Sequence, residues 1–149
     1  MMTYQEKKSI LSIFSNILIF GGYSLYVFVL NQEESLSQIN EPSFWGKFVL
    51  ISIPVSIVAH IIIHIAFVIF NKVTTDEEAP SFSDELDKLI ELKAMQLGYV
   101  VFIVGFMSAM ITQVMHMELY VMFIVLISSG YMASLLDDIA KLYFYRNGI

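Results

Sequence analysis

Apolar residues are concentrated in four long stretches that are separated by short polar segments. The stretches cover about residues 10–30, 47–70, 94–115 and 119–140. About 20 residues of α-helix are needed to cross the roughly 30 Å hydrocarbon core of a bilayer. The pattern therefore predicts an all-α membrane protein, in which one domain of four transmembrane helices forms an antiparallel bundle.

The segments between the stretches differ in kind. Residues 31–46 predict a polar loop that contains Pro42, and residues 116–118 are short enough to predict a tight hairpin between the last two helices. Residues 71–93 predict a cytoplasmic linker, in which Pro80 and two serines favour the start of a helix. The charged segment 83–93 predicts that the third helix begins in water, two to three turns before the bilayer. The fourth helix is expected to continue through Tyr145.

The positive charges predict how the chain is oriented. Lysine and arginine near the ends of transmembrane helices are enriched on the cytoplasmic side. Only Lys47 falls between the first and second stretches, and the other seven of the eight basic residues fall on the opposite side. Those seven are Lys7, Lys8, Lys72, Lys88, Lys93, Lys141 and Arg146. Both termini and the central linker are therefore predicted to be cytoplasmic.

Composition narrows the classes of protein. At 149 residues and 57% hydrophobic content, the chain has the size of one domain but too little polar surface for a soluble one. The net charge of −6 argues against nucleic acid as a partner, and the absence of cysteine excludes disulfides and thiolate metal sites. The sequence has no phosphate-binding loop and no hydrolase or metalloprotease motif. We therefore expect a protein that is not an enzyme, with no catalytic residues and no cofactor.

One motif gives a family resemblance. The segment "DELDKLIELKAMQLGYVV", together with the opening "EKKSIL" and the closing "LYFYRNG", resembles an uncharacterised family of small bacterial four-span inner-membrane proteins. The resemblance implies a multi-pass location in the bacterial cytoplasmic membrane, and it implies no activity. This chain departs from the family pattern at Ser134, where relatives often carry glutamate, and at Asn147, where they carry arginine.

Polar residues inside the apolar stretches are the best candidates for a functional site, because unpaired polar groups are costly in hydrocarbon. His60 and His64 are four residues apart and share one face of the second helix. They can be hydrogen-bonded core residues, a proton relay, or, with lower weight, ligands of a metal or haem. Helix counting places other polar groups at similar depths. The predicted polar core comprises Asn16, His60, His64, Tyr99, Ser128 and Ser129, with contacts expected from Asp137 through His64 to Asn16, and from His60 to Ser129.

Small residues predict where helices approach closely. Gly98 and Gly105 lie seven residues apart, and Gly105 with Ala109 forms a small-xxx-small pair. Ser129 with Ala133 forms another in the fourth helix. Such residues let helix backbones pack together in a membrane. We expect a compact bundle.

The charged ends of the helices favour a role in protein association. The first hypothesis is an accessory module of the membrane that binds a second copy, a membrane protein or a cytoplasmic protein, through residues 83–93 and 137–146. Its candidate partner-binding residues are Asp84, Glu85, Asp87, Lys88, Glu91, Asp137 and Asp138. The alternative is a small oligomeric channel or transporter with a histidine-containing polar core.

Overall fold

The computed structural model describes residues 2–75 and 84–149. These residues form five α-helices and one π-helical segment, with no strand among them. In chain order the elements are α1 (Tyr4–Leu25), η1 (Tyr26–Leu30), α2 (Gln32–Gln38), α3 (Pro42–Thr75), α4 (Glu85–Val114) and α5 (Leu119–Asn147).

Four apolar helices were predicted, and the structure confirms them. The continuous helix of α1 and η1, together with α3, α4 and α5, is in each case long and apolar enough to cross a membrane. The segment predicted as a loop between the first two is partly helical, because it contains α2. Pro42 opens α3, where a residue without a backbone N–H is tolerated in the first turn.

The charged start of α4 is built as a helix cap. The side chain of Asp84 accepts a hydrogen bond from the backbone N–H of Glu85 at 2.7 Å, and Asp87 Oδ2 accepts one from the N–H of Asp84 at 3.3 Å. Acidic groups there also suit the positive end of the helix dipole. From this cap α4 continues without interruption into its apolar half, as the sequence predicts. The serines expected to cap the helix, Ser81 and Ser83, lie outside the described residues.

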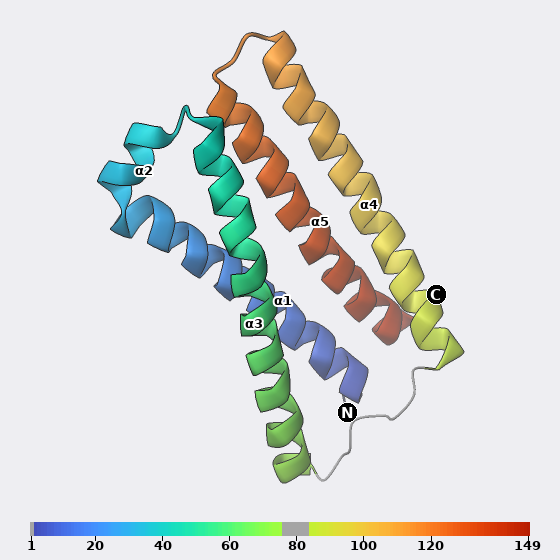
Figure 1. Cartoon of the computed structure of the whole chain (residues 1–149). Coiled ribbons are helices and arrows are strands. Elements are labelled where there is room, and N and C mark those ends of the chain that lie inside the picture. The colour runs from blue at the N-terminus through green and yellow to red at the C-terminus, as the bar shows by residue number, and fades with distance from the viewer. Residues whose placement is uncertain (1, 76–83) are drawn as a thin grey trace.

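Figure 1 shows how the helices are arranged. The helices α4 and α5 form a long antiparallel hairpin, α1 packs against α5, and α3 crosses α1 at an angle. The N-terminus, the C-terminus, the end of α3 and the start of α4 lie at one end of the molecule. Helix α2 and the turn between α4 and α5 lie at the other. In that turn His116 adopts a positive φ of 56°, which lets the chain reverse within four residues.

Close backbone contact holds the α4–α5 hairpin together. A Cβ atom added to Gly105 would lie 2.0 Å from the Cβ of Ser129, and one added to Gly98 would lie 2.9 Å from the carbonyl oxygen of Ala133. Ala94 and Ala109 are completely buried on the same face of α4. Only residues without a large side chain permit two helices to approach this closely.

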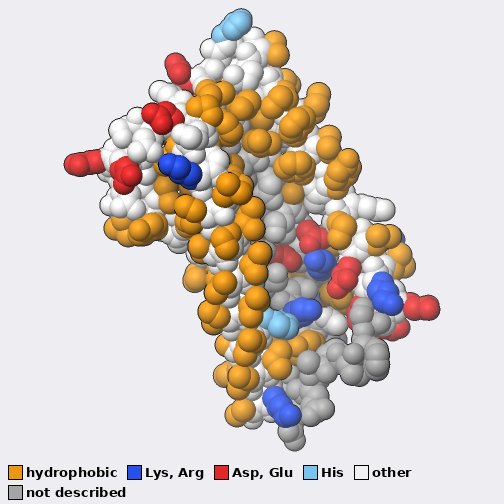
Figure 2. All heavy atoms as spheres, viewed as in Figure 1, with side chains coloured by type: hydrophobic (Ala, Val, Ile, Leu, Met, Phe, Trp, Pro, Cys, Tyr) orange, Lys and Arg blue, Asp and Glu red, His pale blue; other side chains and the backbone are white. Residues whose placement is uncertain are grey.

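The distribution of buried residues is unlike that of a soluble protein. Among the described residues, seven buried side chains are hydrophobic and eight are polar or charged. Large apolar side chains are exposed along all four long helices. Figure 2 shows them covering α3 and much of α4, whereas charged side chains gather around α2 and around the start of α4. A surface of this kind fits hydrocarbon better than water.

Candidate functional site

A polar cluster lies where α1, α3 and α5 meet within their apolar lengths. It consists of Ser12 and Asn16 from α1, His60 from α3 and Asp138 from α5. The hydroxyl of Ser12 donates to Asp138 Oδ2 at 2.9 Å, and the Asn16 side-chain N–H donates to the same oxygen. On its other side, Asn16 Oδ1 lies 3.0 Å from His60 Nε2. Asn16 therefore bridges an acidic and a basic side chain.

Local helix geometry explains how the cluster forms. Ser12 and Asn16 are four residues apart, so both side chains project from the face of α1 that packs on α5. His60 is fixed from its own helix, because its Nδ1 lies 2.8 Å from the backbone carbonyl oxygen of Ser56. Asp138 is only 7% exposed, so its carboxyl group depends on these hydrogen bonds for polar contacts.

Two cavities adjoin His60. The larger has a volume of about 520 Å³ and lies between α1, α3 and α5, with walls that are mainly apolar. Its polar lining residues are Asn16, Ser52, Ser56, His60, Tyr131 and Ser134. The smaller has a volume of about 220 Å³ and is lined by Lys8, Ser12, Ser15 and His64 as well as His60. The larger is within the size range of small-molecule sites, which are commonly apolar with a few placed polar groups.

The structure brings only part of the predicted polar core together. Asn16 and His60 are in contact, but the partner of Asn16 on α5 is Asp138, where contacts through Asp137 and His64 were predicted. His64 is exposed and lines the smaller cavity without joining the cluster. Tyr99 is 65% exposed on α4.

The two predicted serines are not in this cluster either. Ser128 faces outward. Ser129 is buried where α4 packs closely on α5 at Gly98 and Gly105, which we call the α4–α5 seam, and its hydroxyl donates to the carbonyl oxygen of Leu126 at 2.7 Å. Ser12 and Asp138 are the members of the cluster that the prediction of a polar core omitted. The spacing from Ser12 to Asn16 was the available signal, since residues four apart share a helix face.

Several predicted partner-binding residues have contacts within the chain. Asp138 belongs to the polar cluster, and Asp137 forms an ion pair with Lys141 at 2.6 Å. Asp87 accepts a hydrogen bond from the side chain of Gln5 at 3.2 Å, in addition to its role in the helix cap. The contact with Gln5 connects the start of α4 to α1. The acidic groups that take part in them have less freedom to bind another molecule.

The outer face of the first turns of α4 is different. Glu85, Lys88 and Glu91 are exposed there. Three leucines lie among them, and Leu86, Leu89 and Leu92 are 54%, 45% and 54% exposed. Ile90 faces inward and is only 1% exposed, so one face of this segment packs and the other is uncovered. We refer to Glu85, Leu86, Lys88, Leu89, Glu91 and Leu92 as the α4 outer face.

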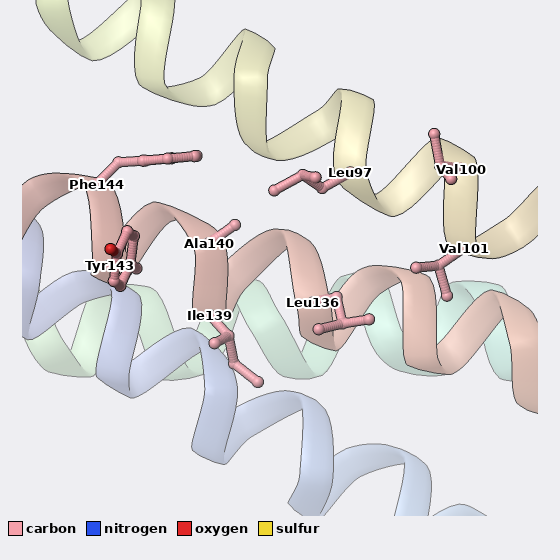
Figure 3. Close-up of a pocket in the computed structure, with 8 residues that line it drawn as sticks. All are labelled: Leu97, Val100, Val101, Leu136, Ile139, Ala140, Tyr143 and Phe144. Carbon is pink, nitrogen blue, oxygen red and sulfur yellow. The ribbon is translucent and has the colours of Figure 1, made fainter. Parts of the chain in front are cut away.

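A further cavity lies between α4 and α5. It has a volume of about 490 Å³, and Figure 3 shows Leu97 of α4 and Phe144 of α5 extending toward one another beside Ala140. Its remaining lining residues are Val100, Val101, Leu136, Ile139 and Tyr143. The lining side chains are apolar apart from the hydroxyl of Tyr143, so this cavity suits an apolar group such as an alkyl chain.

The described residues contain no group of three or more His, Asp or Glu side chains that could hold a metal ion. Both ring nitrogens of His60 lie against oxygen atoms of the chain, which leaves neither nitrogen directed at an open position. Comparisons with protein-family models, curated proteins and solved structures found no match for this chain. The family resemblance of the sequence stays a prediction.

Proposed function

We propose that this protein is a non-enzymatic, four-span protein of the bacterial inner membrane, which has both termini in the cytoplasm and binds a protein partner through the α4 outer face. The exposed leucines of that face are the observation that carries the proposal. The family resemblance supports the bacterial membrane, and the bias of lysine and arginine supports the orientation.

The membrane location is supported by the surface of the four long helices. None of the most apolar window of α3 is buried within the chain, and only 17% of that of α4 is buried. Removing apolar area from water is favourable by roughly 25 cal/mol for each Å². Contact with hydrocarbon would stabilise this surface in the same way.

The α4 outer face supports the choice of partner surface. Lys88 and the cap residue Asp84 lie at the charged start of the helix, before the apolar stretch that begins near Ala94. Leucines exposed before that point would face the cytoplasm or the headgroup region, where burial against another protein stabilises them. Leu86, Leu89 and Leu92 recur every three residues, which is the pattern that an amphipathic partner helix can cover.

The charges beside the leucines define the partner's chemistry. Glu85 and Glu91 lie beside the three exposed leucines, and Lys88 is the one basic residue of the α4 outer face. The partner that fits is an amphipathic helix with lysine or arginine beside its apolar face. Acidic groups that pair with those residues would orient the complex more than they would strengthen it.

The test is a site-specific photo-crosslinker placed at Leu89 in cells, with Val104 as the control position on the lipid-facing part of the same helix. We expect a discrete protein adduct from position 89 and none from position 104. The double substitution Glu85→Gln and Glu91→Gln should lower the adduct yield several-fold, in line with exposed ion pairs of up to about 1 kcal/mol each.

The matched charge control is on α2. The double substitution Glu33→Gln and Glu34→Gln makes the same change in net charge on an exposed helix at the other end of the molecule, and should leave the yield unchanged. The proposal would be contradicted if both double substitutions lowered the adduct yield equally, or if position 89 gave no protein adduct. Asp87 is unsuitable for this test, because its contacts with Gln5 and Asp84 are structural.

A second candidate function is a small oligomeric channel or transporter, and the observation that favours it is the cavity of about 520 Å³ beside His60. Purified protein reconstituted in liposomes would be assayed for flux of protons and small cations. Flux that disappears in His60→Gln and persists in His116→Gln would favour transport. Absence of flux in protein of defined oligomeric mass would remove this candidate.

A further inference from the structure

We propose that His60 and Asp138 form a charge-neutral pair, an imidazolium and a carboxylate joined by the side-chain amide of Asn16, and that this junction is a proton-binding site. The polar cluster is separate from the α4 outer face, so this proposal does not rest on the binding of a protein partner. It follows from counting donors and acceptors around three side chains.

The count begins at His60. Its Nδ1 lies 2.8 Å from the backbone carbonyl oxygen of Ser56, and its Nε2 lies 3.0 Å from the side-chain carbonyl oxygen of Asn16. Both oxygens are acceptors and carry no hydrogen. With the side-chain oxygen of Asn16 facing the ring, both ring nitrogens donate, and an imidazole that donates from both nitrogens is the imidazolium cation.

The count at Asp138 gives the opposite charge. Its Oδ2 accepts hydrogen bonds from the Ser12 hydroxyl and from the Asn16 side-chain N–H. Two donors at Oδ2 leave that oxygen unprotonated and favour the carboxylate form of Asp138 as the counter-charge of the imidazolium. The positive ring and the negative carboxylate offset each other, which is required of charges held in an apolar setting.

The two hydrogen bonds of the Asn16 side chain can both form only when the cluster holds one proton. Its N–H faces the carboxylate and its carbonyl faces the imidazolium, so the amide dipole matches both charges. If His60 loses its proton from Nε2, two acceptors face each other across 3.0 Å, and if the proton leaves Nδ1 the same conflict arises with Ser56. Rotating the amide of Asn16 lets its N–H donate to a neutral His60 but turns its carbonyl oxygen toward Asp138, which must then carry the proton. Either arrangement holds one proton, and the orientation of Asn16 in the structure is the one that places it on His60.

The surroundings contain few other charges. Lys8 of α1 and His64 of α3 line the smaller cavity together with His60. On α5, Asp137 lies next to Asp138 in sequence but is paired with Lys141. Release of the proton would leave two acceptors facing each other at one end of the Asn16 amide, which weakens the contacts between α1 and its neighbours α3 and α5 at this point.

The experiment is solid-state NMR of the full chain in lipid bilayers at neutral pH, with ¹⁵N-labelled histidine. The chain has three histidines, so the variants His64→Gln and His116→Gln assign the spectrum. We expect His60 to give an imidazolium spectrum, with hydrogen on both nitrogens. A neutral imidazole at His60 in the wild-type chain would overturn the proposal.

Two substitutions on α5 then test the pairing. Asp138→Asn removes the negative charge while keeping the shape of the side chain, and the imidazolium signal of His60 should be lost. Asp137→Asn removes a charge from the adjacent position and should leave that signal in place. An imidazolium that persists in Asp138→Asn would show that Asp138 is not its counter-charge, and would contradict the pair. The wild-type spectrum decides the protonation state even where a variant does not fold.

Discussion

The α4–α5 seam and the junction of α1, α3 and α5 hold their helices together in different ways. At the seam, Gly98 and Gly105 bring backbone against backbone, and no hydrogen bond between side chains is needed. At the junction, the link between α1 and α3 is a hydrogen bond between His60 and Asn16, in a region where two cavities adjoin His60. The seam depends on shape, whereas the junction depends on polar groups and a proton.

This difference indicates which part of the molecule can move. A close-packed interface loses many small contacts when it opens, so it is effectively rigid. Helix α3 has little packing to lose in its apolar middle. It is held nearer its ends, where the Tyr23 hydroxyl donates to the carbonyl oxygen of Phe48 at 3.1 Å and the ring of Phe67 packs against that of Tyr4. We expect the α4–α5 hairpin to be the stable frame of the protein and α3 to be its adjustable element.

The largest expected effect comes from filling the seam. In Gly105→Ala the new methyl group would overlap the Cβ of Ser129, which forces the helices apart and should lower the free energy of unfolding by about 1–3 kcal/mol or more. Gly105→Leu should prevent the hairpin from forming. Denaturation in detergent or bicelles, followed by circular dichroism, measures both effects.

Controls for the seam are available within the chain. Gly22 has no atom within 4 Å of an added Cβ, so Gly22→Ala should not destabilise the protein. Adding Ser129→Gly to Gly105→Ala removes the overlapping atoms and should restore most of the lost stability. If Gly105→Ala were as stable as Gly22→Ala, the seam would not be close-packed.

An intermediate effect is expected at the junction. Asn16→Ala leaves Asp138 and His60 without their shared partner, and an unsatisfied buried polar group costs about 1–3 kcal/mol. In a double-mutant cycle, Asn16→Ala and His60→Ala should be coupled by about 0.6 kcal/mol, the average for hydrogen bonds between membrane helices, and by no more than about 1.7 kcal/mol. If the two substitutions changed the free energy of unfolding additively, the hydrogen bond between Asn16 and His60 would contribute nothing to stability.

A smaller effect is expected where α4 begins. Asp87→Ala removes the contact with Gln5 and part of the helix cap, which should lower the free energy of unfolding by about 1 kcal/mol. Glu91→Ala, one turn further along on the exposed face, should change it by less than about 0.5 kcal/mol. Equal effects at the two positions would contradict the distinction between structural and exposed acids.

The sequence was sufficient to predict the helices, because a 20-residue apolar run has few other interpretations. Helical spacing also pointed to Gly98 and Gly105 as a packing face. The bounds were less accurate. Residues 31–46 were expected to be a loop, yet α2 forms there, since a short polar helix gives no apolar signal.

The polar cluster was only partly predictable. Counting residues along each helix estimates depth, and this placed Asn16 in one layer with His64 and placed His60 one turn deeper, whereas in the structure Asn16 contacts His60. It does not give the rotation of one helix about its axis relative to the next, so it could not choose between Asp137 and Asp138. Those two residues are adjacent in sequence but point about 100° apart on a helix, and only the packing of α1 on α5 turns Asp138 inward.

Cysteine accessibility tests the central claim, four crossings of the membrane with both ends in the cytoplasm, most directly. The chain has no cysteine, so single variants at Glu33, Glu85 and Arg146 can be labelled without background. With a reagent that does not cross the inner membrane, we predict that position 33 reacts in intact cells and that positions 85 and 146 react only after the membrane is opened. Labelling of position 85 or 146 in intact cells would contradict the account.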